Sequence, residues 1–248
     1  FVIDSSSLIE ILADHQPKGI YQTNPSTIEF LRDDSGSVTG TLIKTKNKTV
    51  RIATQRIIFC AGEGNQALIE KAALKTPQSQ VRPLNMVYVK RPKLPMVFMH
   101  CIGSNFSLTP SLTITSHQDK MGITTWYLGG ELAESGVTKG PTEQIHAAKK
   151  LIFSLFPWIE FDTATWGCFL INRAEANINN NYRPDDACLI EEKNVLVAWP
   201  TKLTLTPVLA DKTIEMLHAT SVKATDREHC AELDSLFNRP SIANAPWS

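Results

Sequence analysis

The chain has 248 residues with a hydrophobic fraction of 42%, enough for one large or two modest domains, and its 25 basic residues balance its 25 acidic ones. This balance argues against nucleic acid or an anionic membrane surface as a partner, because proteins that bind either carry a basic excess. No apolar run reaches the length of about 18 residues that a bilayer span needs, so we expect no membrane span.

The first third of the chain predicts a helix followed by a β-meander. Apolar residues recur at helical spacing over residues 5–13, with Ser5 or Ser6 as the cap. The meander needs three short strands separated by turns of Asp, Ser, Gly and Asn. Strands are predicted at residues 19–23, 26–32, 38–45 and 49–53, of which the last three form the meander.

The next segment predicts a buried strand and a helix. The apolar run from Ile57 to Cys60 is typical of a strand that is buried on both faces, as parallel strands are. A glycine turn at 62–65 then leads into a helix at 66–74.

From Pro83 onward the pattern changes to strands, with one long helix. That helix covers residues 142–156, with Thr142 as its cap and Pro157 at its end. The strands of this part are predicted at residues 86–90, 96–102, 111–117, 123–128 and 165–171.

The last part predicts a hairpin, a polar turn and a helix. Strands at 187–191 and 195–199 form the hairpin, and a helix follows at 208–219. The polar tail holds one further short helix at 225–236. The layout as a whole predicts an α+β fold of two units, one of them a β-rich middle with a mostly antiparallel sheet and one long helix.

Five cysteines are present, an odd number, and they are widely spaced and form no CxxC pair. Three of them lie in apolar runs of strand type. We therefore predict buried, reduced thiols in a cytoplasmic protein, and no metal site. The cysteines are Cys60, Cys101, Cys168, Cys188 and Cys230.

The turn from Trp199 to Pro207 is the most informative segment for function. It connects a strand to a helix start, where unsatisfied backbone N–H groups and the helix dipole favour a negative charge. Lys202 adds a full positive charge there. Pro207 suits the first turn of a helix, and Thr204 or Thr206 would cap it. The alternative is an ordinary turn with a solvated lysine.

Gly62, Gly64 and Ala67 have the spacing G-x-G-x-x-A after a strand and before a helix, which is formally the dinucleotide fingerprint. The acidic residue that should hold a ribose hydroxyl is missing from residues 82–90. Two alternatives are a plain glycine turn and a close backbone approach to a cofactor that another part of the protein binds.

Candidate groups for substrate chemistry lie in the β-rich middle. Arg173 could clamp a carboxylate or phosphate with two parallel hydrogen bonds, or could simply pair with Glu175 on the surface. Arg183 is a second candidate. His100 and His117 end two predicted strands, and either could act as an acid or base, although a lone strand histidine is more often structural.

Together these segments resemble the FAD-dependent oxidoreductases that include D-amino-acid oxidase, glycine oxidase and glycerol-3-phosphate dehydrogenase. The helix and meander after Asp4, the strand 56–64 that ends in Ala-Gly, and the turn after 194–198 carry the resemblance. The family fold implied is a Rossmann-like FAD-binding domain, here partial, beside a β-rich substrate domain. The implied boundaries are 1–82 and 186–220 for the FAD-binding part, 83–185 for the substrate domain and 221–248 for a tail.

The resemblance also implies roles for particular residues. Ala61 and Gly62, with Gly64 beside them, would lie near the adenosine side of FAD. Arg173 aligns loosely with a substrate-side arginine of the family. From its own chemistry rather than from the resemblance, His100 is the second predicted catalytic group. The turn residues that would face the pyrimidine end of the flavin ring are Lys202, Leu203 and Thr204.

Two departures from the family pattern lead to expectations. The family has glycines where this chain has Trp199, Pro200 and Thr201, so we expect side chains to crowd the approach to the flavin. The family's G-x-G-x-x-G lies near the N-terminus, whereas this chain begins at Phe1 within structured sequence. We therefore interpret the chain as a fragment that alone is inactive and binds FAD poorly.

The resulting hypothesis is a portion of an enzyme that oxidises a small, acidic, amine- or hydroxyl-bearing substrate by hydride transfer to flavin. One alternative is a small-molecule-binding or assembly module with a decayed flavin site. The other is an NADP-binding Rossmann protein that uses Gly62 and Gly64, with Lys90 or Arg91 on the 2′-phosphate. The sequence leaves the oligomeric state open.

Overall fold

The computed structural model describes residues 3–16, 18–102, 109–119, 121–178, 184–220 and 231–247. The chain divides into two compact units, each built from several segments. Unit 1 consists of Phe1–His15, Pro83–Asn172 and Ser241–Ser248, and unit 2 consists of Gln16–Arg82 and Arg173–Pro240. The predicted α+β class is confirmed, since the structure combines helices with mainly antiparallel sheets, and β4 and β11 form a parallel pair among the described strands.

The β-meander of unit 2 is confirmed as an antiparallel sheet of order β1-β2-β3. The strand predicted at 19–23 is wrong, because these residues form irregular structure and a 3₁₀ turn, Pro25–Thr27, precedes the first strand. Asn24 caps that turn by accepting the N–H of Ser26. The strands are β1 Ile28–Arg32, β2 Val38–Lys44 and β3 Thr49–Ala53.

A second sheet of unit 2 has the order β10-β11-β4. The predicted hairpin is confirmed in β10 and β11, and β4 pairs parallel to β11 with Ile57 beside Val195. The expectation that β4 is buried on both faces is wrong, because Ile58 is 37% exposed. The strands are β4 Ile57–Phe59, β10 Cys188–Glu192 and β11 Val195–Trp199.

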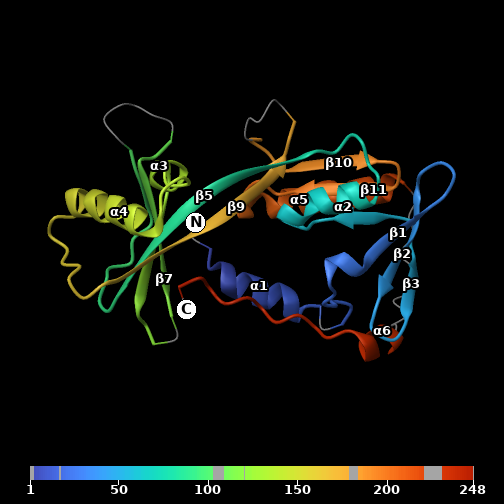
Figure 1. The fold of residues 1–248 in the computed structure, drawn as a ribbon, viewed down its shortest axis with the longest axis horizontal. Helices are drawn as coiled ribbons and strands as arrows, with labels where there is room; N and C mark the ends of the chain where they lie inside the picture. The colour runs from blue at the N-terminus through green and yellow to red at the C-terminus, as the bar shows by residue number, and fades with distance from the viewer. Residues whose placement is uncertain are drawn as a thin grey trace. The chain divides into compact units, whose positions relative to one another are not determined.

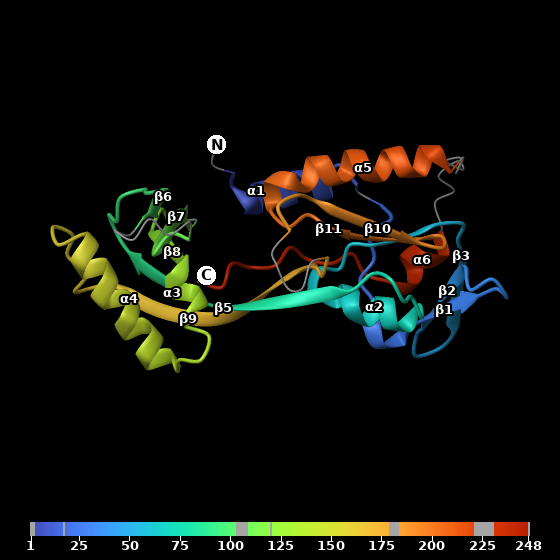
Figure 2. The ribbon, with the colours of Figure 1, turned by 90° about the horizontal axis from the view of Figure 1, so that it is seen from above.

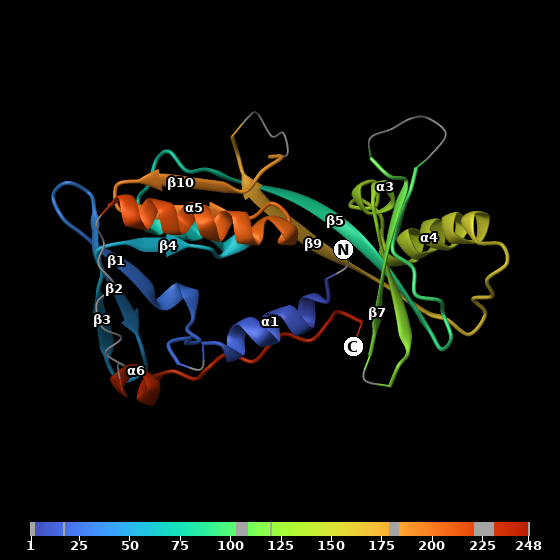
Figure 3. The same cartoon turned by 180° about the vertical axis from the view of Figure 1, so that it is seen from behind.

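Two helices cover opposite faces of this second sheet (Figure 2). Val197 and Trp199 of β11 pack with Ile69, whereas Ala198, which points the other way, packs with Leu209. Alternate residues of one central strand are therefore buried against different helices, which explains why all of β11 is buried. The helices are α2 Asn65–Lys71 and α5 Thr206–Ala219, and α5 runs along β10 in Figure 3.

A five-stranded sheet of order β6-β7-β8-β5-β9 forms the centre of unit 1. The predicted strands of the middle region are present, but β5 and β9 are longer than predicted and continue into unit 2. The strands are β5 Ser79–Arg91, β6 Met99–Cys101, β7 Leu112–Gln118, β8 Thr124–Gly129 and β9 Thr165–Ala176.

One face of this sheet packs against α4 Pro141–Leu155, with the short helix α3 Glu131–Glu134 on the same side (Figure 1). The core there is apolar and includes Trp126, Leu128 and Ile152. The long predicted helix is thus confirmed, but its cap is not Thr142. The helix begins one residue earlier, with Pro141 in its first turn. Proline is tolerated there because it has no backbone N–H and the first turn of a helix needs none for its internal hydrogen bonds.

The predicted N-terminal helix is confirmed as α1 Ser5–Asp14. Its cap is Asp4 rather than Ser5 or Ser6, because the Asp4 carboxylate accepts the N–H groups of Ser6 and Ser7. A short helix α6, Ala231–Leu236, covers the end of the helix predicted at 225–236, whose earlier residues lie outside the described part.

Candidate functional site

The predicted cofactor residues lie at one edge of the β10-β11-β4 sheet. Because β4 and β11 are parallel, their carboxyl ends meet at the same edge, where ligands bind in open α/β sheets. Each strand runs through a short 3₁₀ turn into a helix: Gly62–Gly64 leads into α2, and Leu203–Leu205 leads into α5. All six predicted residues are exposed: Ala61, Gly62, Gly64, Lys202, Leu203 and Thr204.

Asn65 joins the two strand ends. Its side-chain oxygen accepts the N–H of Ala61 at 2.8 Å, and its amide nitrogen donates to the carbonyl of Ala198 at 3.1 Å. Asn65 itself is fully buried. This role was not predicted, since an Asn in a glycine turn has no sequence pattern that marks it as a bridge between distant strands.

The turn after β11 is held in a strained conformation. The N–H of Lys202 bonds to the carbonyl of Pro200 at 2.6 Å, and Thr201 between them has a φ of 61°. A positive φ is rare for a β-branched residue, and such strain concentrates at functional sites. The hydroxyl of Thr201 donates to the carbonyl of Asp186 at 2.9 Å and helps to fix the turn.

The start of α5 differs from the prediction in its cap. Leu205 occupies the N-cap position with no side-chain hydrogen bond, so neither Thr204 nor Thr206 caps the helix. Pro207 lies in the first turn, as predicted. The helix start thus lacks the side-chain oxygen that usually satisfies its first N–H groups.

The Trp199 part of the expected crowding is wrong, whereas Pro200 and Thr201 remain half-buried at the turn. The Trp199 side chain is fully buried and packs in the core with Ile69, so it does not project at the sheet edge. Within the described residues, its indole N–H has no hydrogen-bond partner. The space beside Gly62, after the end of β4, is empty, because no atom lies within 4 Å of the position that a Cβ would take. The φ of Gly62 is 56°, a conformation that favours glycine.

The NADP alternative does not fit this topology. In a dinucleotide-binding βαβ unit, the strand after the helix returns parallel to the first strand. Here α2 is followed by β5, which belongs to a different, antiparallel ladder, whereas the parallel neighbour of β4 is β11. Gly62 and Gly64 therefore serve as a turn at the site edge rather than as a Rossmann start.

The two predicted catalytic residues lie in different units. Arg173 is a half-buried residue within β9 in unit 2, and not at the end of its strand. Its neighbour Glu175 is bound by Arg82 through two hydrogen bonds of 2.9 and 3.0 Å, and is 1% exposed. Arg183 lies outside the described residues.

His100 of unit 1 is exposed on β6, opposite Thr113 of β7. Directly opposed residues share a face, as do alternate residues along a strand. The face turned away from α4 is therefore lined by polar and aromatic side chains. We call it the polar sheet face: Tyr88, Lys90, His100, Thr113, Thr115, His117, Thr125 and Tyr127.

Two titratable groups of the polar sheet face are perturbed. Burial lowers the pKa of His117, and the nearby Asp4 carboxylate partly opposes this. Burial raises the pKa of Tyr127 to about 12, so its hydroxyl stays protonated at neutral pH. His117 Nε2 also lies 3.2 Å from the hydroxyl of Thr115.

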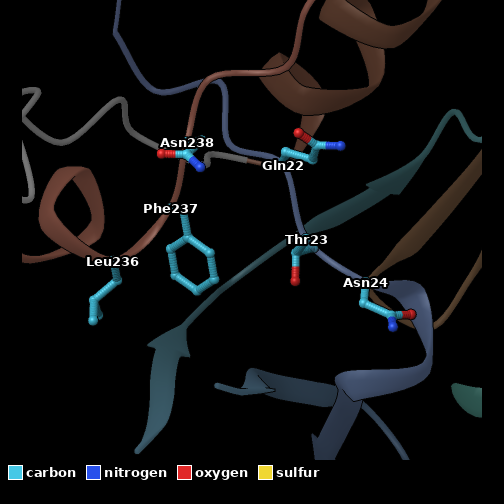
Figure 4. Close-up of a pocket in the computed structure, with 6 residues that line it drawn as sticks. All are labelled: Gln22, Thr23, Asn24, Leu236, Phe237 and Asn238. Carbon is cyan, nitrogen blue, oxygen red and sulfur yellow. The ribbon is translucent and has the colours of Figure 1, made fainter. Parts of the chain in front are cut away.

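Other features of the described residues bear on function less directly. A hollow of about 340 Å³ is lined by Gln22, Thr23, Asn24, Leu236, Phe237 and Asn238 (Figure 4) and includes none of the predicted residues.

No described helix is long and apolar enough to cross a membrane. The described residues contain no cluster of three or more His, Cys, Asp or Glu side chains that could bind a metal ion.

The described cysteines are free thiols, but the prediction that they are buried is wrong. Cys60 is exposed, and the other three are half-buried: Cys101, Cys168 and Cys188. Cys230 lies outside the described residues.

Comparison with known proteins found no matching family model. The chain is 37% identical over 197 residues to the probable FAD-dependent oxidoreductase PA4991 of Pseudomonas aeruginosa, a match that covers 79% of this chain and 49% of that protein. It therefore spans about half the length of this curated relative. The crystal structure of the same oxidoreductase matches with a TM-score of 0.86 and 35% identity, over 99% of this chain and 64% of that one.

A structure of glycerol-3-phosphate dehydrogenase from Bacillus halodurans complexed with FAD matches with a TM-score of 0.48 and 15% identity. That match covers 81% of this chain and 38% of the dehydrogenase. The P. aeruginosa matches confirm the resemblance to FAD-dependent oxidoreductases that was drawn from the sequence.

Proposed function

Because this chain belongs to the FAD-dependent oxidoreductases, we propose that it is part of an enzyme that oxidises a small, acidic, amine- or hydroxyl-bearing substrate. The proposal assigns it to the branch that resembles D-amino-acid oxidase and glycerol-3-phosphate dehydrogenase. Its main support is the sheet edge where Asn65 joins the turn at Ala61 to the end of β11. A bound flavin would accept the hydride from the substrate.

The turn after β11 is proposed to face the pyrimidine end of the flavin ring. Lys202 contributes a positive charge, and the N–H groups at the start of α5 contribute oriented dipoles. Preorganised donors of this kind stabilise negative charge that develops during a reaction. Leu203 and Thr204, both exposed, would border the ring.

The turn after β4 is proposed to lie near the adenosine side of the cofactor. Ala61, Gly62 and Gly64 are exposed, and the positive φ of Gly62 leaves room for close approach of a ligand to the backbone.

The polar sheet face of unit 1 is proposed as the wall of the substrate site. His100, exposed on β6, would exchange a proton with the amine or hydroxyl of the substrate. Arg173, a residue of unit 2, is proposed on its chemistry alone to bind an acidic group through a bidentate contact. We propose these roles on the chemistry of the side chains and on the family resemblance.

The domain roles follow the same proposal. Residues 1–82 and 186–220 would form the partial FAD-binding domain, residues 83–185 the substrate domain, and residues 221–248 a tail. A cytoplasmic location is proposed from the free thiols of the described cysteines.

The alternative of a binding module with a decayed flavin site was based on a crowded turn. With the Trp199 side chain in the core, that argument loses most of its force. We therefore favour the enzyme.

The proposal is tested by comparing this chain with the same chain extended by its native upstream sequence. We expect the extended protein to purify with a flavin absorbance band that small amino or hydroxy acids bleach, and this chain alone to retain little flavin. An extended protein without flavin, even after reconstitution with FAD, would argue for the binding module instead.

A further inference from the structure

An indole ring lies on the polar sheet face of unit 1. The centroid of the Trp247 ring is 4.8 Å from that of His117 and 5.0 Å from that of Tyr127. The backbone carbonyl of Trp247 accepts a hydrogen bond from Lys90 at 3.5 Å. These contacts are made by a segment far from β7 and β8 in sequence, whose approach to the β7 side of the sheet is visible in Figure 3.

The rings beneath Trp247 are held firmly. Tyr127 stacks on Phe169 with ring centroids 5.8 Å apart and planes 9° apart, and its edge meets His117. Lys90 forms an ion pair of 3.0 Å with Asp119. The surface that receives the indole is therefore preorganised by contacts that do not involve Trp247.

The segment that carries the indole is held loosely by comparison. Residues 241–247 form neither helix nor strand, and Ser241 to Asn244 are exposed. Trp247 is half-buried. Its carbonyl contact of 3.5 Å is longer than a good hydrogen bond, so the ring contacts supply most of the attachment.

A buried polar group without a partner lies on the same sheet face as these rings. Thr125 lies between His117 and Lys90 in the register of the sheet and belongs to the same face. It is 1% exposed, and its hydroxyl has no hydrogen-bond partner within the described residues. A buried hydroxyl without a partner lowers stability, so a feature of this kind calls for an explanation.

We propose that His117, Thr125 and Tyr127 form a subsite for a planar ring that carries a hydrogen-bonding atom, and that residues 241–247 are a strap whose indole fills it in the free protein. The ring of the ligand takes the place of the Trp247 indole on His117 and Tyr127. Its polar atom bonds to the hydroxyl of Thr125. The inference rests on the proposed function only in treating this face as the substrate wall.

The test uses free indole as the probe of the subsite and needs no flavin. Indole is titrated into the wild-type chain and into Trp247→Ala, and binding is followed through the imidazole Cε1–H signal of His117 in NMR spectra. Trp158→Ala is the matched control, because Trp158 is 74% exposed in the same unit. A thermal melt of each variant checks that it is folded.

We expect Trp247→Ala to bind indole about tenfold more tightly than the wild type and the control, since the lost ring contacts are those of ordinary aromatic pairs. Adding Thr125→Val should weaken that binding about fivefold, as expected for one lost hydrogen bond. In the chain that keeps Trp247 and has no indole added, the same Thr125→Val substitution should raise the melting temperature, because it removes an unsatisfied hydroxyl.

Equal indole affinity in the wild type and Trp247→Ala, or binding that leaves the His117 signal unmoved, would overturn the strap and its subsite. A Thr125→Val change with no effect on indole binding would overturn the role of the hydroxyl. None of these outcomes depends on flavin retention, so failure of the proposed oxidoreductase activity would be seen separately.

Discussion

The side-chain amide of Asn65 donates a hydrogen bond to the backbone carbonyl of Ala198, and so ties the start of α2 to the neighbouring strand β11. The same side chain accepts the N–H of Ala61. One fully buried residue thus connects the two chain segments that we propose to contact the cofactor.

Asn65→Ala should lower the free energy of unfolding by about 2 kcal/mol, because it removes the side-chain partners of the Ala61 N–H and of the buried Ala198 carbonyl. The measurement is urea denaturation of the chain. Asn47→Ala, in the exposed turn between β2 and β3, is the control and should change stability by less than about 0.5 kcal/mol. Similar effects of the two substitutions would contradict the bridging role.

Thr201 offers a test of strain at the site. Thr201→Gly loses the hydroxyl bond to Asp186 but also relieves the penalty of a positive φ, so we expect it to be more stable than Thr201→Val by about 1 kcal/mol. Thr201→Val keeps the unfavourable φ and loses the bond, and should destabilise the chain by about 1 kcal/mol. If valine proved as stable as glycine, the strain would not be real.

The buried ion pair between Glu175 and Arg82 should be costly to break. Glu175→Gln is expected to lower the free energy of unfolding by about 2 kcal/mol, because Glu175 is buried and Arg82, which is 30% exposed and only partly screened by water, loses its counter-charge. The exposed pair of Glu29 and Lys44 provides the control, where Glu29→Gln should cost under about 1 kcal/mol. Equal losses would indicate that burial does not strengthen the first pair.

His117 should titrate below the ordinary histidine pKa of 6.5, because burial disfavours its charged form. Trp247→Ala exposes the ring and should move the pKa back up, whereas Asp4→Asn removes a favourable charge and should lower it further. NMR titration of the imidazole signals measures each value. A pKa unchanged by Trp247→Ala would show that the indole does not shield this histidine.

The same shift predicts how stability depends on pH. A histidine whose pKa is lower in the folded state binds fewer protons there than in the unfolded state. Well above pH 6.5, its titration therefore contributes nothing to the free energy of unfolding. As the pH falls below 6.5, the unfolded state takes up the proton first, and the free energy of unfolding decreases. Urea denaturation at pH 7.5 and 5.5 should show a loss of stability that is smaller in His117→Gln than in the wild type.

Lys202 can be tested in the flavin-loaded, extended protein. Lys202→Met should lower the two-electron reduction potential by roughly 20 mV, since an exposed charge near the reduced ring contributes about 1 kcal/mol. Lys193→Met, in the β10–β11 turn at the opposite end of β11, should leave the potential unchanged. Equal shifts in both variants would remove Lys202 from the flavin environment.

Local pattern was sufficient to predict the meander, the hairpin of β10 and β11, the long helix α4 and the family resemblance. Periodicity and turn residues are properties of neighbouring residues, so they can be read without knowing the fold. Helix caps were predicted less well, as at Asp4 and Leu205, because a cap depends on which side chain reaches a particular N–H group.

Tertiary structure alone decided the remaining features of the site. The sequence placed Trp199 in a turn that should crowd a ligand, but the alternation of β11 turns its indole into the core. Asn65 becomes a bridge only because β4 and β11 pair in parallel. Trp247 meets His117 and Tyr127 only because distant segments come together on one sheet face, and no local pattern encodes that the buried hydroxyl of Thr125 is left without a partner among the described residues.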